Sequence, residues 1–256
     1  MVRLFQTKRG LLALLAFATI WFIILYYFVN SAAGYVTSNS FKAMADQLFG
    51  TLGLSALLEW SVSEYAIYWL IAVYFFPLFS IVVCNDQLCS DKQRGTLRFI
   101  TLRATRVEVV LGRYLGQLLI ISILILLTLI ATAILACVRD ISLLLASLTI
   151  GAKLLLELII VVMPFIALMS LFNTFVGTAK LAVVIATLFF GLGPLFIAVI
   201  KHLFGQEFYL NLIFPGGQIE SILAQSGVGV SHYLLPLMQT LVFVLCANIV
   251  MKRAAI

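Results

Sequence analysis

The sequence is divided into long apolar stretches that contain almost no charge. A membrane-spanning helix needs about 20 consecutive apolar residues, and stretches of this length recur along the whole chain. They are residues 11–29, 65–84, 114–136, 154–172, 181–200 and 233–250. Backbone polar groups cannot stay unpaired in lipid, so each stretch is expected to form a helix. The predicted fold class is all-α: a polytopic integral membrane protein with six transmembrane helices in one domain over residues 1–256.

The composition excludes an ordinary soluble domain. Hydrophobic residues make up 64% of the 256 residues and charged residues only 10%, whereas a soluble domain has roughly 45–50% and about 25%. The net charge of +6 therefore has to be interpreted by its position in the membrane flanks. No soluble segment is long enough to form a basic nucleic-acid-binding face. We expect contact with membrane lipids and no nucleic-acid partner.

The distribution of Lys and Arg predicts an orientation. Segments carrying many Lys and Arg residues stay on the cytoplasmic side during insertion. With six spans, twelve of the 16 basic residues fall on the side that carries both termini, and the other four are Lys42, Arg139, Lys153 and Lys201. We therefore expect both termini in the cytoplasm.

Three segments between the spans are expected to lie outside or at the outer surface. Residues 30–64 contain amphipathic runs at 41–48 and 52–60. Residues 201–232 are expected to hold short outer helices between the fifth and sixth spans, or alternatively a re-entrant hairpin. Residues 141–152 are apolar but end at Lys153. We favour a separate interfacial or outward-lying helix there. The alternative is one very long tilted helix that includes the fourth span.

Lys153 and Glu157 place a charged pair at the edge of the fourth span. Their spacing of four residues puts them on one face of a helix. Glu157 would lie about one turn inside the membrane, where an ionisable residue often lines a substrate path. Alternatively, the two side chains form a snorkelling ion pair at the outer interface. Both interpretations remain open at this point.

Catalytic motifs are missing from the predicted spans. The two histidines, His202 and His232, fall in outer segments, and the sequence contains no G-x-x-x-x-G-K-[ST] phosphate-binding loop. Cys84 and Cys89 have no histidine nearby and give a poor zinc signal. We expect no enzymatic activity, cofactor or metal site on this chain.

The connection between the second and third spans, residues 85–113, is the one densely charged loop between apolar stretches. It carries six basic residues: Lys92, Arg94, Arg98, Arg103, Arg106 and Arg113. Gly95 predicts a break, and Thr96 predicts an N-cap for a short helix beginning at Leu97. Such a helix, with Leu97 and Ile100 on one face, suits a groove on an acidic partner. Adsorption to anionic headgroups is an equal alternative on physical grounds.

Three runs in this loop resemble a known family. They are DKQRGTL at 91–97, Thr105-Arg106, and LGRYLG at 111–116. The pattern is similar to the permease subunits of type-2 ABC transporters, in which an acidic run precedes Gly-Thr-Leu. Arg103 stands where the family usually has proline, and Asp91 where it usually has glutamate.

The resemblance implies a function and a set of partners. The chain would be a single permease domain of an exporter in a bacterial inner (plasma) membrane, paired with a second permease chain that is identical or related. Two separate cytoplasmic ATPase subunits would bind ATP and Mg²⁺. Residues 85–113 would provide the coupling helix that contacts them. The implied coupling residues are Asp91, Arg94, Gly95, Thr96, Leu97, Arg98, Ile100 and Arg106, with Leu97 and Ile100 as the anchor and the arginines at the rim.

A different class of function uses the same loop. The chain could be a membrane sensor or assembly factor whose basic loop binds a signalling partner. A co-purifying ATPase would favour the transporter, whereas a kinase or regulator without an ATPase would favour the sensor.

Overall fold

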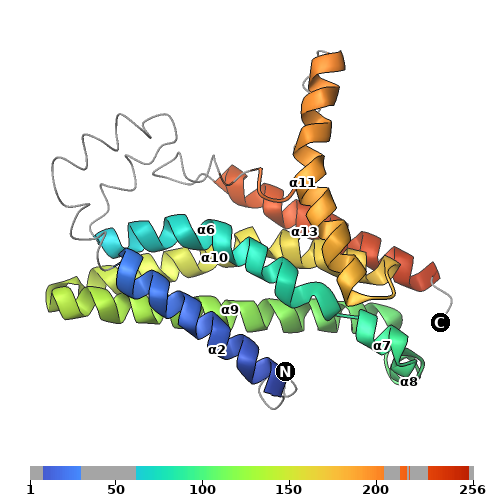
Figure 1. The fold of residues 1–256 in the computed structure, drawn as a ribbon, viewed down its shortest axis with the longest axis horizontal. Helices are drawn as coiled ribbons and strands as arrows, with labels where there is room; N and C mark the ends of the chain where they lie inside the picture. The colour runs from blue at the N-terminus through green and yellow to red at the C-terminus, as the bar shows by residue number, and fades with distance from the viewer. Residues whose placement is uncertain (1–7, 30–61, 205–213, 218, 220–229, 254–256) are drawn as a thin grey trace. The chain divides into compact units, whose positions relative to one another are not determined.

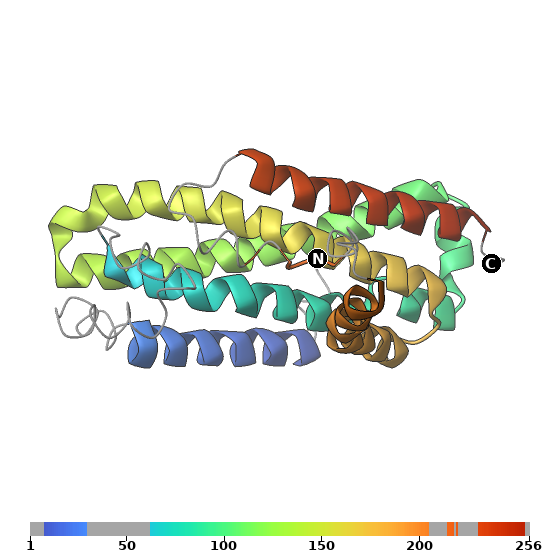
Figure 2. The same cartoon turned by 90° about the horizontal axis from the view of Figure 1, so that it is seen from above.

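The computed structural model describes residues 8–29, 62–204, 214–217, 219 and 230–253 (Figures 1 and 2). Every regular element within these ranges is helical, which confirms the all-α prediction. The elements in chain order are α2 (Lys8–Ile23), η1 (Ile24–Val29), α6 (Ser63–Val83), η3 (Cys84–Asp86), α7 (Cys89–Gln93), α8 (Thr96–Thr101), α9 (Arg106–Arg139), η4 (Ile141–Leu143), α10 (Leu144–Phe175), α11 (Ala179–Phe204) and α13 (Val230–Arg253).

Five segments of the described chain are long and apolar enough to cross a membrane, as expected for a multi-pass membrane protein. They are Ser63–Gln93, Arg106–Arg139, Ile141–Phe175, Ala179–Ile200 and Tyr233–Arg253. The first predicted span is also helical, as α2 followed by the π-helical turns of η1. Its apolar part, Leu14–Tyr27, is shorter than the other five.

The expectation of a separate helix over 141–152 is wrong. After the single turn of η4, α10 runs without interruption from Leu144 to Phe175. Lys153 does not end the helix because a charged side chain four residues before Glu157 is compatible with a helical backbone. The structure therefore has one long helix here, which was the alternative interpretation. The runs at 41–48 and 52–60, and the segment 220–229 expected to hold an outer helix, lie outside the described residues.

The chain divides into two compact units. The first unit comprises Met1–Tyr74, Ile120–Leu158 and Glu220–Val228. Its core includes Tyr65 and Tyr68 of α6, both buried. The Tyr65 hydroxyl donates to the Leu129 carbonyl oxygen at 3.3 Å, and the Tyr68 hydroxyl lies 2.8 Å from Thr128 Oγ1. Buried tyrosine hydroxyls need such partners, so these bonds fix α6 against α9 within this unit.

The second unit comprises Phe75–Leu119, Ile159–Ile219 and Gly229–Ile256. It contains the charged loop 85–113, one end of α9, one end of α10 and the whole of α13. A buried apolar cluster joins these parts and consists of Leu88, Leu97, Val109, Val110, Ala247 and Met251. The loop is therefore part of a folded core and is packed against two long helices, α9 and α13.

Candidate functional site

The charged loop folds into two short helices, α7 and α8, separated by a turn at Arg94 and Gly95. Gly95 has a φ of 67°, in the left-handed region that glycine adopts without a steric cost. The predicted break at Gly95 is confirmed. The predicted N-cap is wrong, because Gly95 occupies that position and Thr96 is the first helical residue.

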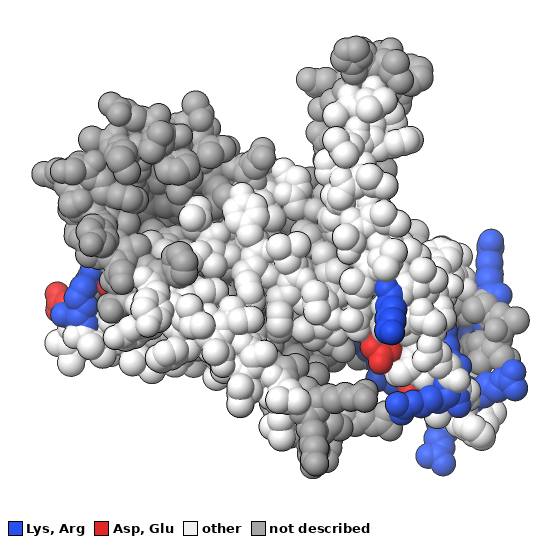
Figure 3. Space-filling view, viewed as in Figure 1, with Lys and Arg blue, Asp and Glu red and all other residues white. Residues whose placement is uncertain are grey.

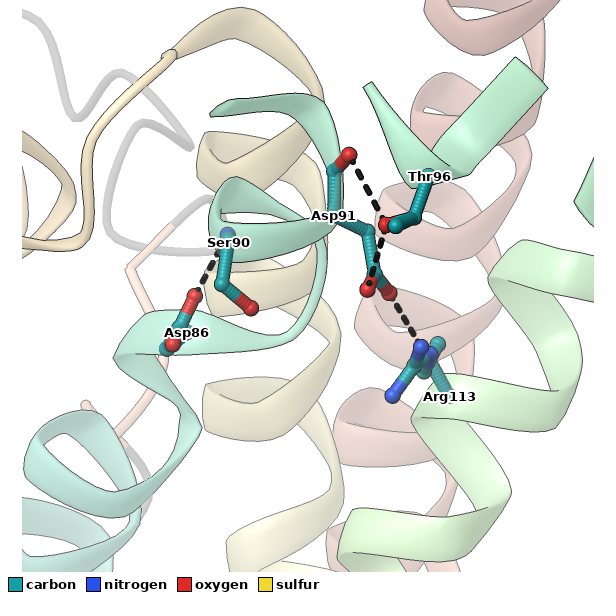
Figure 4. Close-up of polar contacts among 5 residues, drawn as sticks. All are labelled: Asp86, Ser90, Asp91, Thr96 and Arg113. Atoms are coloured by element: carbon teal, nitrogen blue, oxygen red, sulfur yellow. Dashed lines mark hydrogen bonds and ion pairs between the residues drawn. The ribbon is translucent and has the colours of Figure 1, made fainter. Parts of the chain in front are cut away.

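Thr96 instead links the two short helices to each other. Its hydroxyl lies 3.2 Å from both the carbonyl oxygen and the Oδ1 atom of Asp91. Asp91 is buried and also forms an ion pair with Arg113 of α9 through its other carboxylate oxygen (Figure 4). The carboxylate therefore connects α7, α8 and α9, and it has little surface to offer a partner.

Lys92 fixes the same hairpin to α10. Its Nζ atom donates to the carbonyl oxygens of Asn173 at 2.8 Å, Thr174 at 2.6 Å and Val176 at 3.3 Å. The last carbonyl groups of a helix have no partner within the helix. A lysine cation at this position satisfies them and interacts favourably with the negative end of the helix dipole.

Asn173 adds a second connection between α10 and the loop. Its Nδ2 atom donates to the carbonyl oxygen of Cys84 at 3.1 Å and to that of Met169 at 2.7 Å. Its Oδ1 atom lies 3.0 Å from the Cys89 sulfur. Asn173 is fully buried, so all of these bonds lie away from water, where an unpaired polar group is costly.

Arg106 is partly exposed and binds the last turn of α13. Its Nη1 atom donates to the carbonyl oxygens of Met251 and Lys252, each at 3.0 Å. These carbonyl groups belong to the last turn of α13. Arg106 thus holds the end of α13 against the start of α9. Its expected part in coupling stays a prediction.

The apolar side chains of α8 fall into two groups. Leu97 is 2% exposed within the buried cluster, and Ile100 packs against that cluster. Phe99 is 71% exposed and Leu102, just after the helix, is 81% exposed. Leu97 is thus used within the fold. Phe99 and Leu102 are the apolar groups of this hairpin that a second molecule can reach.

The remaining predicted site residues of the hairpin are close in sequence to these two apolar side chains. Arg94, Gly95 and Arg98 are all exposed, as is Arg103. We call the surface formed by Arg94, Arg98, Phe99, Leu102 and Arg103 the docking platform. The sequence prediction did not include Phe99, and spacing alone cannot show that Leu97 points inward, because that depends on α9 and α13.

The second candidate site forms as the spacing predicts. Lys153 Nζ lies 3.8 Å from Glu157 Oε1, and the side chains are 56% and 6% exposed, respectively. This distance is too long for a hydrogen bond. The pair thus combines a nearly buried carboxylate with a largely exposed ammonium group.

A second ion pair joins the buried Glu64 of α6 to Arg139 in the last turn of α9. Arg139 Nε lies 3.1 Å from Glu64 Oε1.

The next residue, Asp140, accepts a hydrogen bond from the Ser142 backbone nitrogen at 2.9 Å. This bond lowers the pKa of the Asp140 carboxyl group below its usual value. The deprotonated form therefore favours the turn between α9 and α10.

The described residues offer little for metal chemistry, since they contain no group of three or more His, Cys, Asp or Glu side chains close enough to hold a metal ion. The hairpin is fixed to α9 and α10 by polar contacts, and its apolar side chains Phe99 and Leu102 are exposed together with neighbouring arginines. No protein-family model matches the chain, and a comparison with curated proteins finds no match.

Proposed function

We propose that the chain is the permease subunit of an ATP-driven transporter of the type-2 ABC class, most simply an exporter. Two permease chains form the translocation path, and two separate cytoplasmic subunits hydrolyse ATP. The docking platform faces the cytoplasm and transmits the movement of an ATPase to the membrane helices. ATP and Mg²⁺ belong to the partner.

The main support is the way in which the platform is attached. A coupling element must be stiff, because a loop that yields cannot transmit force. Asp91 connects the hairpin to Arg113 of α9, and Lys92 connects it to the carbonyl end of α10. A loop that served only as a linker would not need these buried polar contacts.

The outward side of the platform supports the kind of contact that we propose. Fully burying Phe99 or Leu102 in a partner is worth about 1.5–3 kcal/mol each. Exposed ion pairs of Arg94 or Arg98 are worth about 0–1 kcal/mol. The affinity should therefore come mainly from Phe99 and Leu102. This differs from the sequence-based expectation, which placed Leu97 and Ile100 at the contact.

Affinity purification in mild detergent tests the proposal. We expect an ATPase with a Walker motif to co-purify in near-stoichiometric amount, and nucleotide hydrolysis to require that subunit. A partner that is a kinase or a regulator without an ATPase would support the sensor interpretation and contradict ours.

A pair of variants tests the contact itself. Phe99→Asp combined with Leu102→Asp should release the ATPase, because two apolar anchors would be replaced by charges. Ile141→Asp is the matched control, since Ile141 is a similarly exposed apolar residue in η4, just after the last residue of α9. Leu97→Asp is unsuitable here because it would also disrupt the buried cluster. Full retention of the ATPase by the Phe99/Leu102 double variant would exclude this contact.

A further inference from the structure

The last turn of α13 lies directly against the hairpin that carries the docking platform. Arg106 holds two of its backbone carbonyl groups, those of Met251 and Lys252, at 3.0 Å. Met251 and Ala247 are fully buried in the same cluster as Leu97. Figure 1 shows the C-terminal end of α13 close to α7 and α8. The turn is therefore fixed in position by polar and apolar contacts.

The side chains at this end of α13 extend the charge of the platform. Lys252 and Arg253 are exposed, like Arg94, Arg98 and Arg103. Figure 3 shows Lys and Arg side chains gathered at the end that carries α8 and the end of α13. Among described residues 85–113 and 247–253, the exposed carboxylates are Asp86 and Glu108. Each of these already accepts a backbone N–H, from Ser90 and Thr105 respectively.

We infer that the docking platform and the last turn of α13 form one continuous docking surface for an acidic face of a soluble protein. This inference rests on the proposed function for the identity of the partner, the ATPase subunit. Phe99 and Leu102 would enter an apolar pocket, and Lys252 and Arg253 would meet carboxylates beside it. The surface therefore combines parts of the chain that are about 150 residues apart in sequence.

The position of this surface along α9 favours a protein over lipid. Residues 114–138 of α9 carry no charge, and at 1.5 Å per residue they extend about 37 Å. The hydrocarbon layer is about 30 Å thick. Residues 106–113 therefore extend about 12 Å beyond the uncharged stretch. α8 is attached at that far end, so with the uncharged stretch in the membrane Phe99 and Leu102 would lie beyond the hydrocarbon layer, where a protein surface can cover them.

Site-specific photo-crosslinking in intact cells tests the inference. Benzoylphenylalanine is placed at Phe99 and at Arg253, with Lys180 as the control because it is an exposed basic residue on a different helix, α11. We expect positions 99 and 253 to capture the same Walker-motif ATPase, identified by mass spectrometry, and position 180 to capture none.

The outcomes separate the inference from the proposed function. Capture of the ATPase from position 99 but not from 253 would overturn the composite surface and leave the function intact. Capture of lipid alone from position 253 would also overturn the composite surface. It would mean that the last turn of α13 contacts anionic lipid headgroups. Absence of any ATPase from both positions would overturn the proposed function as well.

A charge-reversal variant gives a second measurement. Lys252→Glu combined with Arg253→Glu keeps the backbone carbonyl groups that Arg106 binds, so the turn should stay in place. We expect affinity for the purified ATPase, once identified, to fall about tenfold or more in 0.15 M salt, with a weaker salt dependence than the parent chain. An unchanged affinity and salt dependence would exclude these residues from the surface.

Discussion

Asp91 illustrates how this chain uses charged residues within its own fold. Its carboxylate is buried, but one oxygen pairs with Arg113 and the other lies within hydrogen-bond distance of the Thr96 hydroxyl. A buried charge is tolerated only when it is paired and hydrogen-bonded. Removing either partner would leave the other group without compensation. We therefore assign to Asp91 a role in holding the hairpin and not a direct contact with a partner.

The first prediction concerns the stability of this pair. Asp91→Ala should lower the free energy of unfolding by about 1.5–3 kcal/mol, the usual value for hydrogen bonds to a charged group. Arg113→Ala should cost at least as much, because it leaves the buried Asp91 carboxylate without its cation, whereas Asp91→Ala leaves an Arg113 side chain that is 44% exposed and can be hydrated. Each kcal/mol lowers Tm by about 2–4 °C in a chain of this size, which thermal unfolding in detergent can measure.

The control for this experiment is Arg98→Ala, which removes an exposed cation and should change the unfolding free energy by less than about 0.5 kcal/mol. In a double-mutant cycle the two substitutions at Asp91 and Arg113 should be clearly non-additive. Strict additivity would show that the pair does not form.

At the residue scale, sequence spacing predicts local pairs but not distant ones. The Lys153–Glu157 pair follows from helix periodicity alone. The contacts of Lys92 with the end of α10, and of Arg106 with the end of α13, join residues about 80 and 145 positions apart. Helical periodicity cannot indicate contacts between residues so far apart. The sequence therefore shows that Lys92 and Arg106 belong to the loop, but it does not show which carbonyl groups they bind.

At the scale of single elements, the hairpin depends on one backbone conformation. Gly95 lies between α7 and α8 with a φ of 67°. A side chain in this left-handed region costs about 1–2 kcal/mol. Gly112 lies within α9 and does not have a positive φ. An added methyl group would meet no other atom within 4 Å at either position, so backbone conformation is the main difference between the two glycines.

The second prediction uses these two glycines as a matched pair. Gly95→Ala should destabilise the chain by about 1–2 kcal/mol, and it should weaken retention of the ATPase because α8 would be displaced. Gly112→Ala should be neutral or stabilise the chain by about 0.5–1 kcal/mol, as expected for glycine replaced within a helix. Thermal unfolding of both variants measures the difference. Equal effects would show that the left-handed turn does not form.

The sequence predicted the presence of the long helices better than the residues at which helices begin. Apolar length identified every long helix, because a membrane-spanning segment has a nearly continuous hydrophobic signal. The start of α10 was misplaced since Lys153 resembles a boundary when it is considered alone. Thr96 resembles an N-cap in sequence, but the hydroxyl is directed to Asp91, and only the folded hairpin brings these two residues together.

At the scale of the whole molecule, the number of membrane crossings determines whether the two ends of the chain lie on the same side of the membrane. Six crossings return the chain to the side where it began, whereas five leave its ends on opposite sides. The described chain has five long apolar segments, and α2 with η1 is the remaining candidate. The 16 residues of α2 extend about 24 Å at the α-helical rise, and the π-helical turns of η1 lengthen this segment toward the hydrocarbon thickness of about 30 Å. We therefore expect six crossings.

The third prediction tests this topology by cysteine labelling, after replacement of the four native cysteines. A cysteine at Ile141 should react with a membrane-impermeant maleimide in intact cells, because this exposed residue follows the end of α9 that lies away from the platform. Cysteines at Arg98 and at Arg3 should react only after permeabilisation. Labelling at Arg3 but not at Arg98 in intact cells would mean that α2 does not cross. Labelling at Arg98 in intact cells would place the docking platform outside, where no cytoplasmic ATPase could reach it.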